Sequence, residues 1–254
     1  MKALVFAAGL GTRLKPLTDT MPKALVPVEG KPLLYHVVSK LKAAGIDRIV
    51  INVHHFPDSV IGYVKEQDSF GIDIRFSDER DFLLDTGGGI LHARKLLEGG
   101  PFLVHNVDII SDLDIGWFIS RTRPEALASL VVSERKTRRY FLFDDDMRLV
   151  GWTDTATGEV RSPYPGLDPD KCRKYAFAGI HYISDRIFSV FDEDGWEGRF
   201  PIVDFYLKEC ARYPVYGVVP PHLTLIDAGK PETLAQAGEF LRNHLNTKEY
   251  GKEV

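Results

Sequence analysis

The stretch "KALVFAAGLGTRLKPLTDTMPKAL", residues 2–25, decides the fold of this chain. Its apolar run "ALVF" is typical of a buried strand. A loop with two glycines, Gly9 and Gly11, follows the run, and "PLLYHVVSKLKAAG" (residues 32–45) then has the apolar spacing of a helix that ends at a glycine. A strand, a glycine-rich loop and a helix in this order predict the first unit of an α/β fold.

The same alternation continues through the first half of the chain. Further strands are expected at residues 48–53, 72–77 and 101–106, and further helices at 57–67 and 88–100. This spacing predicts βαβ units and a mainly parallel sheet. Ligands of such sheets bind at the carboxyl ends of the strands, near a topological switch point.

The second half is richer in strands. We expect a surface hairpin and loop at residues 153–171, which are full of turn formers. No internal repeat or long linker divides the chain, so we expect a single domain, residues 1–254, with a three-layer α/β/α, Rossmann-like fold whose halves share one sheet. The other expected elements are strands at 126–134, 139–144, 148–153 and 174–183, and helices at 184–191, 201–213 and 231–245.

The composition limits the classes of partner. A net charge of −4 argues against a nucleic-acid surface, which needs a basic excess. No apolar run approaches the roughly 18 residues of a membrane span, so no membrane partner is expected. The apolar start breaks on Gly9, Gly11 and Arg13, which favours a buried strand over a signal peptide. Cys172 and Cys210 are the only cysteines, so a cytoplasmic location is expected.

The opening loop can be compared with three phosphate-binding motifs. The dinucleotide fingerprint needs a third glycine where this chain has Leu14, and a P-loop needs Gly-Lys-Ser/Thr, which is absent. The third possibility is a nest of backbone N–H groups, with Arg13 and Lys23 adding positive charge for phosphate oxygens. An ordinary strand-to-helix turn with solvated cations is the alternative, and "GxGTR" alone leaves both open.

Taken whole, the opening string resembles the signature of the sugar-1-phosphate nucleotidyltransferases, and the resemblance covers nearly the whole chain. It implies that Arg13 grips a triphosphate and Lys23 the α-phosphate region, as catalytic cations that bind phosphates and not a carboxylate in the core. It also implies nucleotide contacts from Ala8, Gly9, Gly11 and Thr12. The spacing that carries it runs through Gly9, Gly11, Arg13, Pro16, Leu17, Thr18, Pro22 and Lys23.

Two aspartates match further marks of this family. Asp108 lies in "LVHNVDI", after an expected strand, and Asp227 lies in "LTLIDAGKPETL", before the last helix. The resemblance implies that both hold Mg²⁺, with Asp108 also catalytic, and carboxylates suit this ion. Each could alone be a helix N-cap or a turn residue. Val107 and Lys230 depart from the family pattern, which often has Gly and Thr there.

Two more strings suggest contacts with the base and the sugar. In "LLDTGGGILHA", Gly87, Gly88 and Gly89 are expected to open a helix and to meet the nucleobase, and this string looks most like that of N-acetylmuramate-1-phosphate uridylyltransferases. "YAFAGIHYI" matches the strand that lines the family's sugar pocket, which implies sugar contacts from Phe177 and Gly179, with Asn106 beside them. The Glu-Lys-Pro motif of many hexose enzymes is absent, so the contact to the sugar phosphate is unassigned.

Two further segments, a pair of histidines and a basic run, predict a function less specifically. His54 and His55 suggest a metal site, but neighbouring strand residues point to opposite faces, which favours a structural or pocket-edge role. The basic run "RKTRR", residues 135–139, is expected to be a solvated face that could also frame an acidic ligand.

The resemblance implies transfer of a nucleotidyl group from a nucleoside triphosphate to a sugar 1-phosphate, with release of pyrophosphate and with Mg²⁺ as cofactor. UTP with N-acetylmuramate 1-phosphate or a similar hexose 1-phosphate is expected. GTP with mannose 1-phosphate, cytidylyl transfer, and a non-catalytic nucleotide-sugar sensor are the alternatives. The nucleotide is assigned to residues 1–110 and the sugar to 111–226, before a C-terminal helix at 230–245, in a monomer or homodimer.

Overall fold

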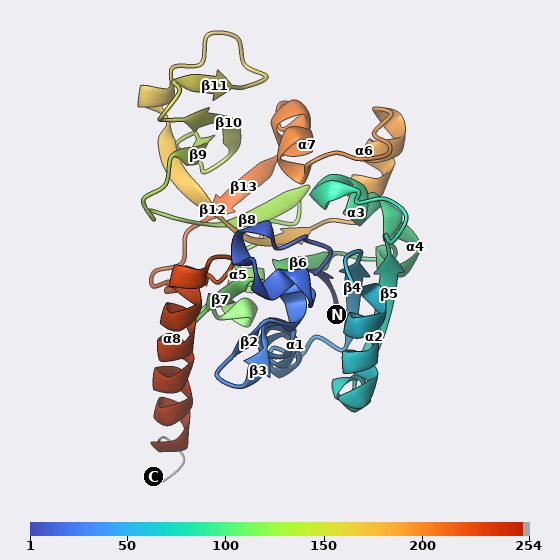
Figure 1. Ribbon diagram of the computed structural model, residues 1–254. Coiled ribbons are helices and arrows are strands. Elements are labelled where there is room, and N and C mark those ends of the chain that lie inside the picture. Colours follow the sequence, from blue (N-terminus) through green and yellow to red (C-terminus); the bar gives the residue numbers. More distant parts are fainter. Residues whose placement is uncertain (251–254) are drawn as a thin grey trace.

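The computed structural model describes residues 1–250, with the backbone alone for residues 244–250 (Figure 1). Its largest sheet has ten strands in the order β11-β10-β9-β12-β6-β1-β4-β5, with β8 beside β12 and β13 beside β8. The strands of the first half pair in parallel, as expected for βαβ units. They are β1 (Lys2–Phe6), β4 (Arg48–Val53), β5 (Asp73–Asp78) and β6 (Phe102–Asn106).

The second half extends the same sheet through a reversal of strand direction. β12 (Arg173–Ile183) is antiparallel to β6, and β8 (Ala128–Ser133) is antiparallel to β12. β13 (Val215–Val218) is parallel to β8. β8 and β13 therefore run in the direction of β6, and the carboxyl ends of β1, β4, β5, β6, β8 and β13 share one edge, which we call the carboxyl edge.

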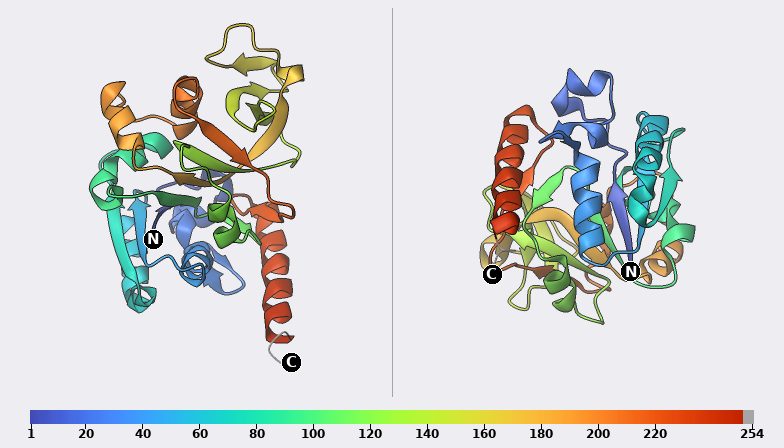
Figure 2. Two further views of the ribbon diagram at one scale, coloured as in Figure 1. Left: turned by 180° about the vertical axis from the view of Figure 1, so that it is seen from behind. Right: turned by 90° about the horizontal axis from the view of Figure 1, so that it is seen from below.

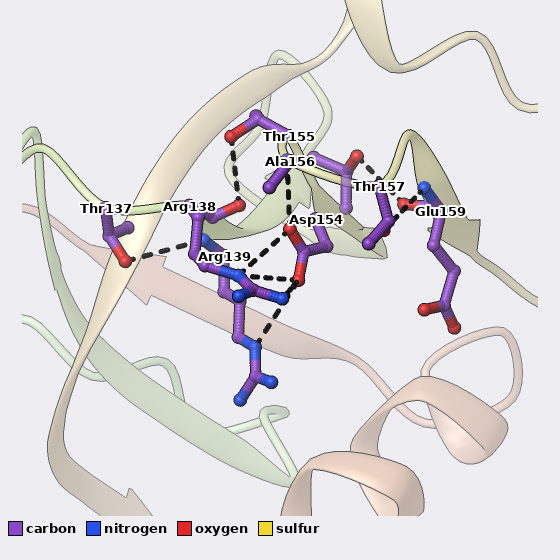
Figure 3. A network of polar contacts seen from close by, with 9 residues as sticks. Thr137, Arg138, Arg139, Asp154, Thr155, Ala156, Thr157 and Glu159 are labelled. Carbon is purple, nitrogen blue, oxygen red and sulfur yellow. Dashed lines mark hydrogen bonds and ion pairs between the residues drawn. The ribbon is translucent and has the colours of Figure 1, made fainter.

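A small antiparallel extension of the sheet projects at one end of the molecule (Figure 1). It consists of β9 (Arg139–Phe143), β10 (Leu149–Asp154) and β11 (Glu159–Arg161). The pairing of β10 with β11 forms the expected hairpin. Arg138 holds the buried Asp154 at 2.9 and 2.6 Å, and Arg139 lies 3.6 Å from the same carboxylate (Figure 3). The hydrogen bonds from Arg138 lower the pKa of Asp154.

Helices cover both faces of the sheet, so the expected three-layer arrangement is confirmed (Figure 1). One core, with Val5 and Ile51, lies under α1 (Leu33–Ala43), α2 (Pro57–Glu66), α5 (Ile115–Ser120) and α8 (Pro231–Tyr250). Seen from below, α8, α1 and α2 lie side by side across that face (Figure 2). The second core, with Leu4 and Val50, lies under α3 (Asp85–His92), α4 (Arg94–Leu97), α6 (Ile187–Glu193) and α7 (Ile202–Glu209).

The helix expected at residues 88–100 differs from the structure. α3 begins three residues earlier, at Asp85, so the three glycines are its third to fifth residues and do not begin it. The helix also divides at Ala93 into α3 and α4. Glycine is a poor helix former, so its presence there has a packing reason, which is described with the site.

Several short elements were not expected from the sequence. α5 has six residues, and its N-cap is Asp114, whose side chain accepts a hydrogen bond from the Trp117 N–H at 2.9 Å. The others are too short to show a periodicity in the sequence. They are β2 (Pro27–Val28), β3 (Lys31–Pro32), β7 (Ile109–Ser111), β14 (Leu225–Asp227) and β13.

Two buried histidines should make stability depend on pH. Burial lowers the pKa of His105 to about 4 and that of His181 to about 3. Below about pH 6.5 the unfolded chain therefore binds protons that the folded chain does not, so stability falls as the pH falls from 6.5 toward 4. Each histidine should contribute up to about 1.4 kcal/mol per pH unit to this slope.

Urea unfolding between pH 4.5 and 7.5 measures the slope. We expect the combined His105→Gln and His181→Gln variant to show a shallower dependence than the original chain. His222→Gln is the control, since His222 is exposed and should leave the slope unchanged. If the free energy of unfolding changed with pH by the same amount in all three proteins, His105 and His181 would not be its source.

Candidate active site

The opening loop leaves β1 at the carboxyl edge and folds back on itself. Gly11 has a φ of +66°, and a Cβ there would lie 2.7 Å from Cγ2 of Thr18. The Thr18 hydroxyl donates to the Gly11 carbonyl at 2.8 Å, which fixes the turn. Gly9 has no heavy atom within 4 Å of its Cβ position. The packing of the protein therefore does not require a glycine at position 9, and its backbone is open to a ligand.

Both predicted cations of this loop form ion pairs with the two predicted metal ligands. Lys23 binds Asp108, and Nη1 of Arg13 lies 3.6 Å from Oδ2 of Asp227. The expectation that these cations have no carboxylate partner is therefore wrong. The reason is that β1 and β6 are neighbours, so the residues that follow them meet at one edge.

A short antiparallel pair brings the two aspartates together. Asp108 immediately precedes β7, and Asp227 ends β14, where it lies opposite Ile109. The N–H of Ala228 donates to the Asp108 carbonyl at 2.8 Å, which ties the two segments. Burial alone would raise the pKa of Asp227, but the Gly229 N–H and the charges of Arg13 and Lys23 hold it below its ordinary value.

The absence of a side chain at Gly229 lets these groups converge, and we call the place where they meet the carboxylate cradle. A Cβ at this position would lie 2.7 Å from Asp227 Oδ1, 2.9 Å from Asp108 Oδ2 and 2.7 Å from Arg13 Nη2. Two carboxylates that converge on one small space fit Mg²⁺, which binds one or two protein carboxylates and completes its shell with phosphate oxygens and water. Among the described side chains, no cluster of three His, Cys, Asp or Glu residues offers another metal site.

A pocket of about 270 Å³ opens beside the ion pairs, on the side of β4 and β5. Five of the predicted site residues line it, namely Ala8, Gly9, Lys23, Asn106 and Asp108. Gly11, Thr12 and Arg13 belong to the same loop but lie outside the lining. The other lining residues are Phe6, Asn52, Glu79, Leu83, Asp85, Thr86 and Val107.

Asn52 and Glu79 form the floor of this pocket, and the sequence analysis missed both. Oδ1 of Asn52 accepts the N–H groups of Ala7 and Ala8 at 2.7 and 3.2 Å, which holds the start of the opening loop. Glu79 is buried and accepts from Asn52 Nδ2 at 2.9 Å and from the Leu84 N–H at 3.2 Å. Burial raises the pKa of Glu79 despite these hydrogen bonds.

A sequence signal for both residues exists. Asn52 is the one uncharged polar residue in the apolar run "RIVINV", and Glu79 directly follows the last residue of β5. A buried polar group needs a partner, so a single amide in a buried strand indicates a structural or binding role. Glu79 also follows a strand of the parallel sheet, and ligands of such sheets bind at the carboxyl ends of strands.

Two of the three glycines of α3 pack against the segment before α7. A Cβ at Gly87 would lie 2.3 Å from the Phe200 ring, and one at Gly88 would lie 2.2 Å from the Gly198 carbonyl. The N–H groups of Gly87 and Gly88 both donate to the Phe200 carbonyl, at 2.8 and 3.2 Å. These two N–H groups are already engaged, so helix packing explains Gly87 and Gly88 without a base. A Cβ at Gly89 would instead lie 2.9 Å from Oε1 of Glu79, beside the pocket. Contact between Gly87–Gly89 and a nucleobase stays a prediction.

The three predicted sugar residues lie around an irregularity in β12. The register of β12 against β8 shifts between Phe177 and His181, and Gly179 there has a φ of +72°. A Cβ on Gly179 would lie 2.6 Å from Nδ2 of Asn106, so glycine allows Asn106 to pack against this strand. The Phe177 ring lies 5.6 Å from Phe141 and 5.4 Å from His181. Their contacts with a sugar remain predictions.

The adjacent histidines each bind a backbone carbonyl. Nδ1 of His54 lies 2.7 Å from the Glu79 carbonyl, and Nε2 of His55 lies 3.4 Å from the Thr18 carbonyl. Both contacts tie segments that border the pocket, which is a structural role.

Among the described residues, no helix has the length and apolar content needed to cross a bilayer.

Comparison with known proteins agrees with this geometry. The sequence profile of the family described as "Nucleotidyl transferase" matches residues 2–142. An N-acetylmuramate alpha-1-phosphate uridylyltransferase of Caulobacter vibrioides is 36% identical over 236 residues, which cover 91% of this chain and 92% of that protein. A mannose-1-phosphate guanyltransferase of Aspergillus oryzae is 41% identical over 115 residues, or 44% of this chain and 31% of that protein.

Solved structures share the fold. A Bacillus anthracis protein assigned as a glucose-1-phosphate thymidylyltransferase superposes with a TM-score of 0.78, at 22% identity, over 95% of each chain. The profile covers more than half of the chain, and the Caulobacter relative covers almost all of it. The chain therefore belongs to the nucleotidyl transferase family, and its resemblance to the sugar-1-phosphate nucleotidyltransferases is confirmed.

Proposed function

We propose that this enzyme joins UTP to N-acetylmuramate 1-phosphate, or to a closely related hexose 1-phosphate, and releases pyrophosphate. The observation that carries the proposal is the meeting of two cations and two carboxylates at the carboxyl edge, beside a pocket of about 270 Å³. The choice of UTP and of the sugar is supported by the similarity to the Caulobacter uridylyltransferase along almost the whole chain.

The chemistry needs positioning and charge neutralisation more than a general base. An oxygen of the sugar phosphate attacks the α-phosphorus in line and forms a new P–O bond. The bond from the α-phosphorus to the bridging oxygen breaks, and pyrophosphate leaves with the electron pair. The attacking phosphate is largely ionised at neutral pH, because its second pKa is about 6. Holding the two phosphates at the attack distance therefore supplies much of the rate.

Lys23 and Arg13 bind the phosphates in this mechanism. Lys23 lies between the opening loop and Asp108, so its ammonium can turn from the carboxylate to an α-phosphate oxygen. Arg13 is half exposed beside Asp227 and can place its planar guanidinium on the β- and γ-phosphates. Gly9 leaves the backbone of the loop open for close approach of the same phosphates.

Asp108 and Asp227 would hold Mg²⁺ at the carboxylate cradle. When bound there, the ion supplies positive charge to the α-phosphate and to the leaving pyrophosphate. The carboxylates orient toward the cradle because the Gly229 N–H donates to Asp227 Oδ1 at 2.9 Å and the β7–β14 pair fixes the backbone. A non-catalytic sensor is disfavoured, because all four of these charged side chains are present and meet.

The base is expected in the pocket above Asn52 and Glu79. A uracil edge has one N–H between two carbonyls, and backbone groups around the pocket can bind it without a dedicated side chain. Guanine carries an additional amine that needs an acceptor. Asp85 lines the pocket, but its Oδ1 already accepts the Thr86 N–H at 2.7 Å. Guanine would therefore depend on the other oxygen of Asp85, since both oxygens of Glu79 already accept hydrogen bonds, from Asn52 and from the Leu84 N–H.

We expect kcat/KM for UTP to exceed that for GTP by more than tenfold with the same sugar phosphate, about 1.4 kcal/mol in barrier. Pyrophosphate release with four nucleoside triphosphates and a panel of sugar 1-phosphates measures this preference. A tenfold preference for GTP that is lost in Asp85→Asn would establish the guanylyltransferase alternative. A preference for CTP would establish cytidylyl transfer, and no release with any pair would contradict the proposal itself.

Other properties follow from the proposed reaction. Since nucleoside triphosphates are made and used in the cytoplasm, a cytoplasmic location is part of the proposal. The substrates are small anions, so no nucleic-acid or membrane partner is proposed. The expectation of a monomer or homodimer stays a prediction.

A further inference from the structure

A groove of about 660 Å³ lies at the carboxyl edge beyond the predicted sugar residues. One wall consists of Ser133, the last residue of β8, and of the next two residues, Glu134 and Arg135. The other wall is the segment after β13, where Val219, Pro220 and Leu223 present apolar surface. Leu225, at the start of β14, closes the groove two residues before Asp227.

The order of the strands shows where this groove lies relative to the base pocket and Asp108. Along the carboxyl edge, β5 and β1 border the base pocket and the opening loop, β6 precedes Asp108, and then come β12, β8 and β13. Adjacent strands are about 4.8 Å apart, so the end of β8 lies two strand spacings, about 10 Å, from β6. A hexose whose 1-phosphate lies at Asp108 would therefore cover β12 and extend a substituent toward the groove.

Arg135 is held in place at the mouth of this groove. Its Nη2 donates to the Phe177 carbonyl at 3.1 Å, at the register shift of β12. The other guanidinium N–H groups can still donate two parallel hydrogen bonds to the two oxygens of one carboxylate. In the same basic run, Arg138 and Arg139 are paired with Asp154 (Figure 3), and Lys136 does not line the groove.

We propose that Arg135 and the apolar wall of this groove recognise a branched, acidic substituent of the sugar, of the kind that N-acetylmuramate carries as its lactyl ether. The inference rests on the proposed function and adds the specificity determinant for the sugar. The lactyl carboxylate would pair with the Arg135 guanidinium, and its methyl group would contact Val219, Pro220 or Leu223.

Two sugar phosphates that differ only in the lactyl ether test the proposal. The probes are N-acetylmuramate 1-phosphate and N-acetylglucosamine 1-phosphate, each with UTP. Arg135→Ala should lower kcat/KM for the lactyl sugar by about 10- to 100-fold, as expected when one charge-assisted pair is removed. The same variant should change kcat/KM for N-acetylglucosamine 1-phosphate by less than about threefold and leave the KM for UTP unchanged.

Three further variants keep the test decisive. Arg135→Gln removes the charge and keeps a shorter, polar side chain, so it separates the effect of charge from that of losing the whole polar side chain. Lys136→Ala removes a neighbouring exposed cation and should leave the preference between the two sugars unchanged. Glu134→Gln removes a negative charge that faces the same groove and should raise kcat/KM for the lactyl sugar.

The outcomes separate this inference from the proposed function. Equal losses with both sugars would show that Arg135 serves the fold or the phosphate, and would overturn the inference. So would an unchanged preference in Arg135→Ala and Arg135→Gln, or an original chain that prefers the sugar without the lactyl group. In each of these cases uridylyl transfer still takes place, so the proposed reaction stands.

Discussion

Asp108→Asn and Asp227→Asn should each lower kcat by about 10³-fold, about 4 kcal/mol of barrier, while the chain still folds. Both carboxylates face the carboxylate cradle at Gly229, and an amide is a weaker, uncharged ligand for a hard cation. Pyrophosphate release with UTP and the sugar phosphate measures kcat, and thermal unfolding measures the fold. Removal of metal with EDTA should abolish the activity of the original chain, and added Mg²⁺ should restore it.

A matched control lies four residues from Asp108. Asp112 is exposed and accepts the Thr224 N–H at 2.8 Å, a bond that Asp112→Asn can keep. This variant should therefore retain full activity. Full activity in EDTA, or in either cradle variant, would show that the two aspartates have a structural role only.

Gly229→Ala examines the cradle without removing a ligand. Gly229 does not have a left-handed φ, so alanine is compatible with its backbone. The added methyl group would lie within 3 Å of both carboxylates, which would have to move apart. A rise of at least tenfold in the Mg²⁺ concentration needed for half-maximal activity is the expected result, and a normal Mg²⁺ dependence would contradict the cradle geometry.

Lys23→Ala should lower kcat by about 10²- to 10³-fold, about 3–4 kcal/mol, because it removes the cation next to the reacting phosphate. Some stability should also be lost, since Asp108 is mostly buried and would have no ammonium partner. Kinetics at a temperature where the variant is fully folded, together with its melting curve, separate the two effects. Lys15→Ala is the control, because Lys15 lies in the same loop but pairs with Asp19 at the surface.

The balance between these two effects tests the role of Lys23. A variant that melts several degrees lower and yet turns over normally once folded would make Lys23 a structural partner of Asp108. Loss of turnover with a small change in melting would support a role on the phosphates.

Much of the fold could be predicted from local sequence patterns. The alternation from Lys2 to Asn106 showed β1, β4, β5, β6, α1 and α2, because strands of five or six residues and helices of about ten have clear periods. Asp108 and Asp227 were found because they lie in strings that resemble marks of the family, Asp108 after an expected strand and Asp227 before the last helix. Elements of three to six residues, such as β7 and β14, were missed, although this pair is what joins the two aspartates.

The sequence by itself determined the α/β alternation, the glycine-rich opening loop and the identity of its charged residues. The tertiary structure alone decided which side chains meet. Lys23 reaches Asp108 because β1 and β6 are neighbours, and Gly87 and Gly88 are required by Phe200 and Gly198, more than a hundred residues away. Arg135 joins the same edge as Asp108 because β12 reverses direction between β6 and β8. Strand order and direction depend on pairing between distant segments, and a local pattern of residues does not encode that pairing.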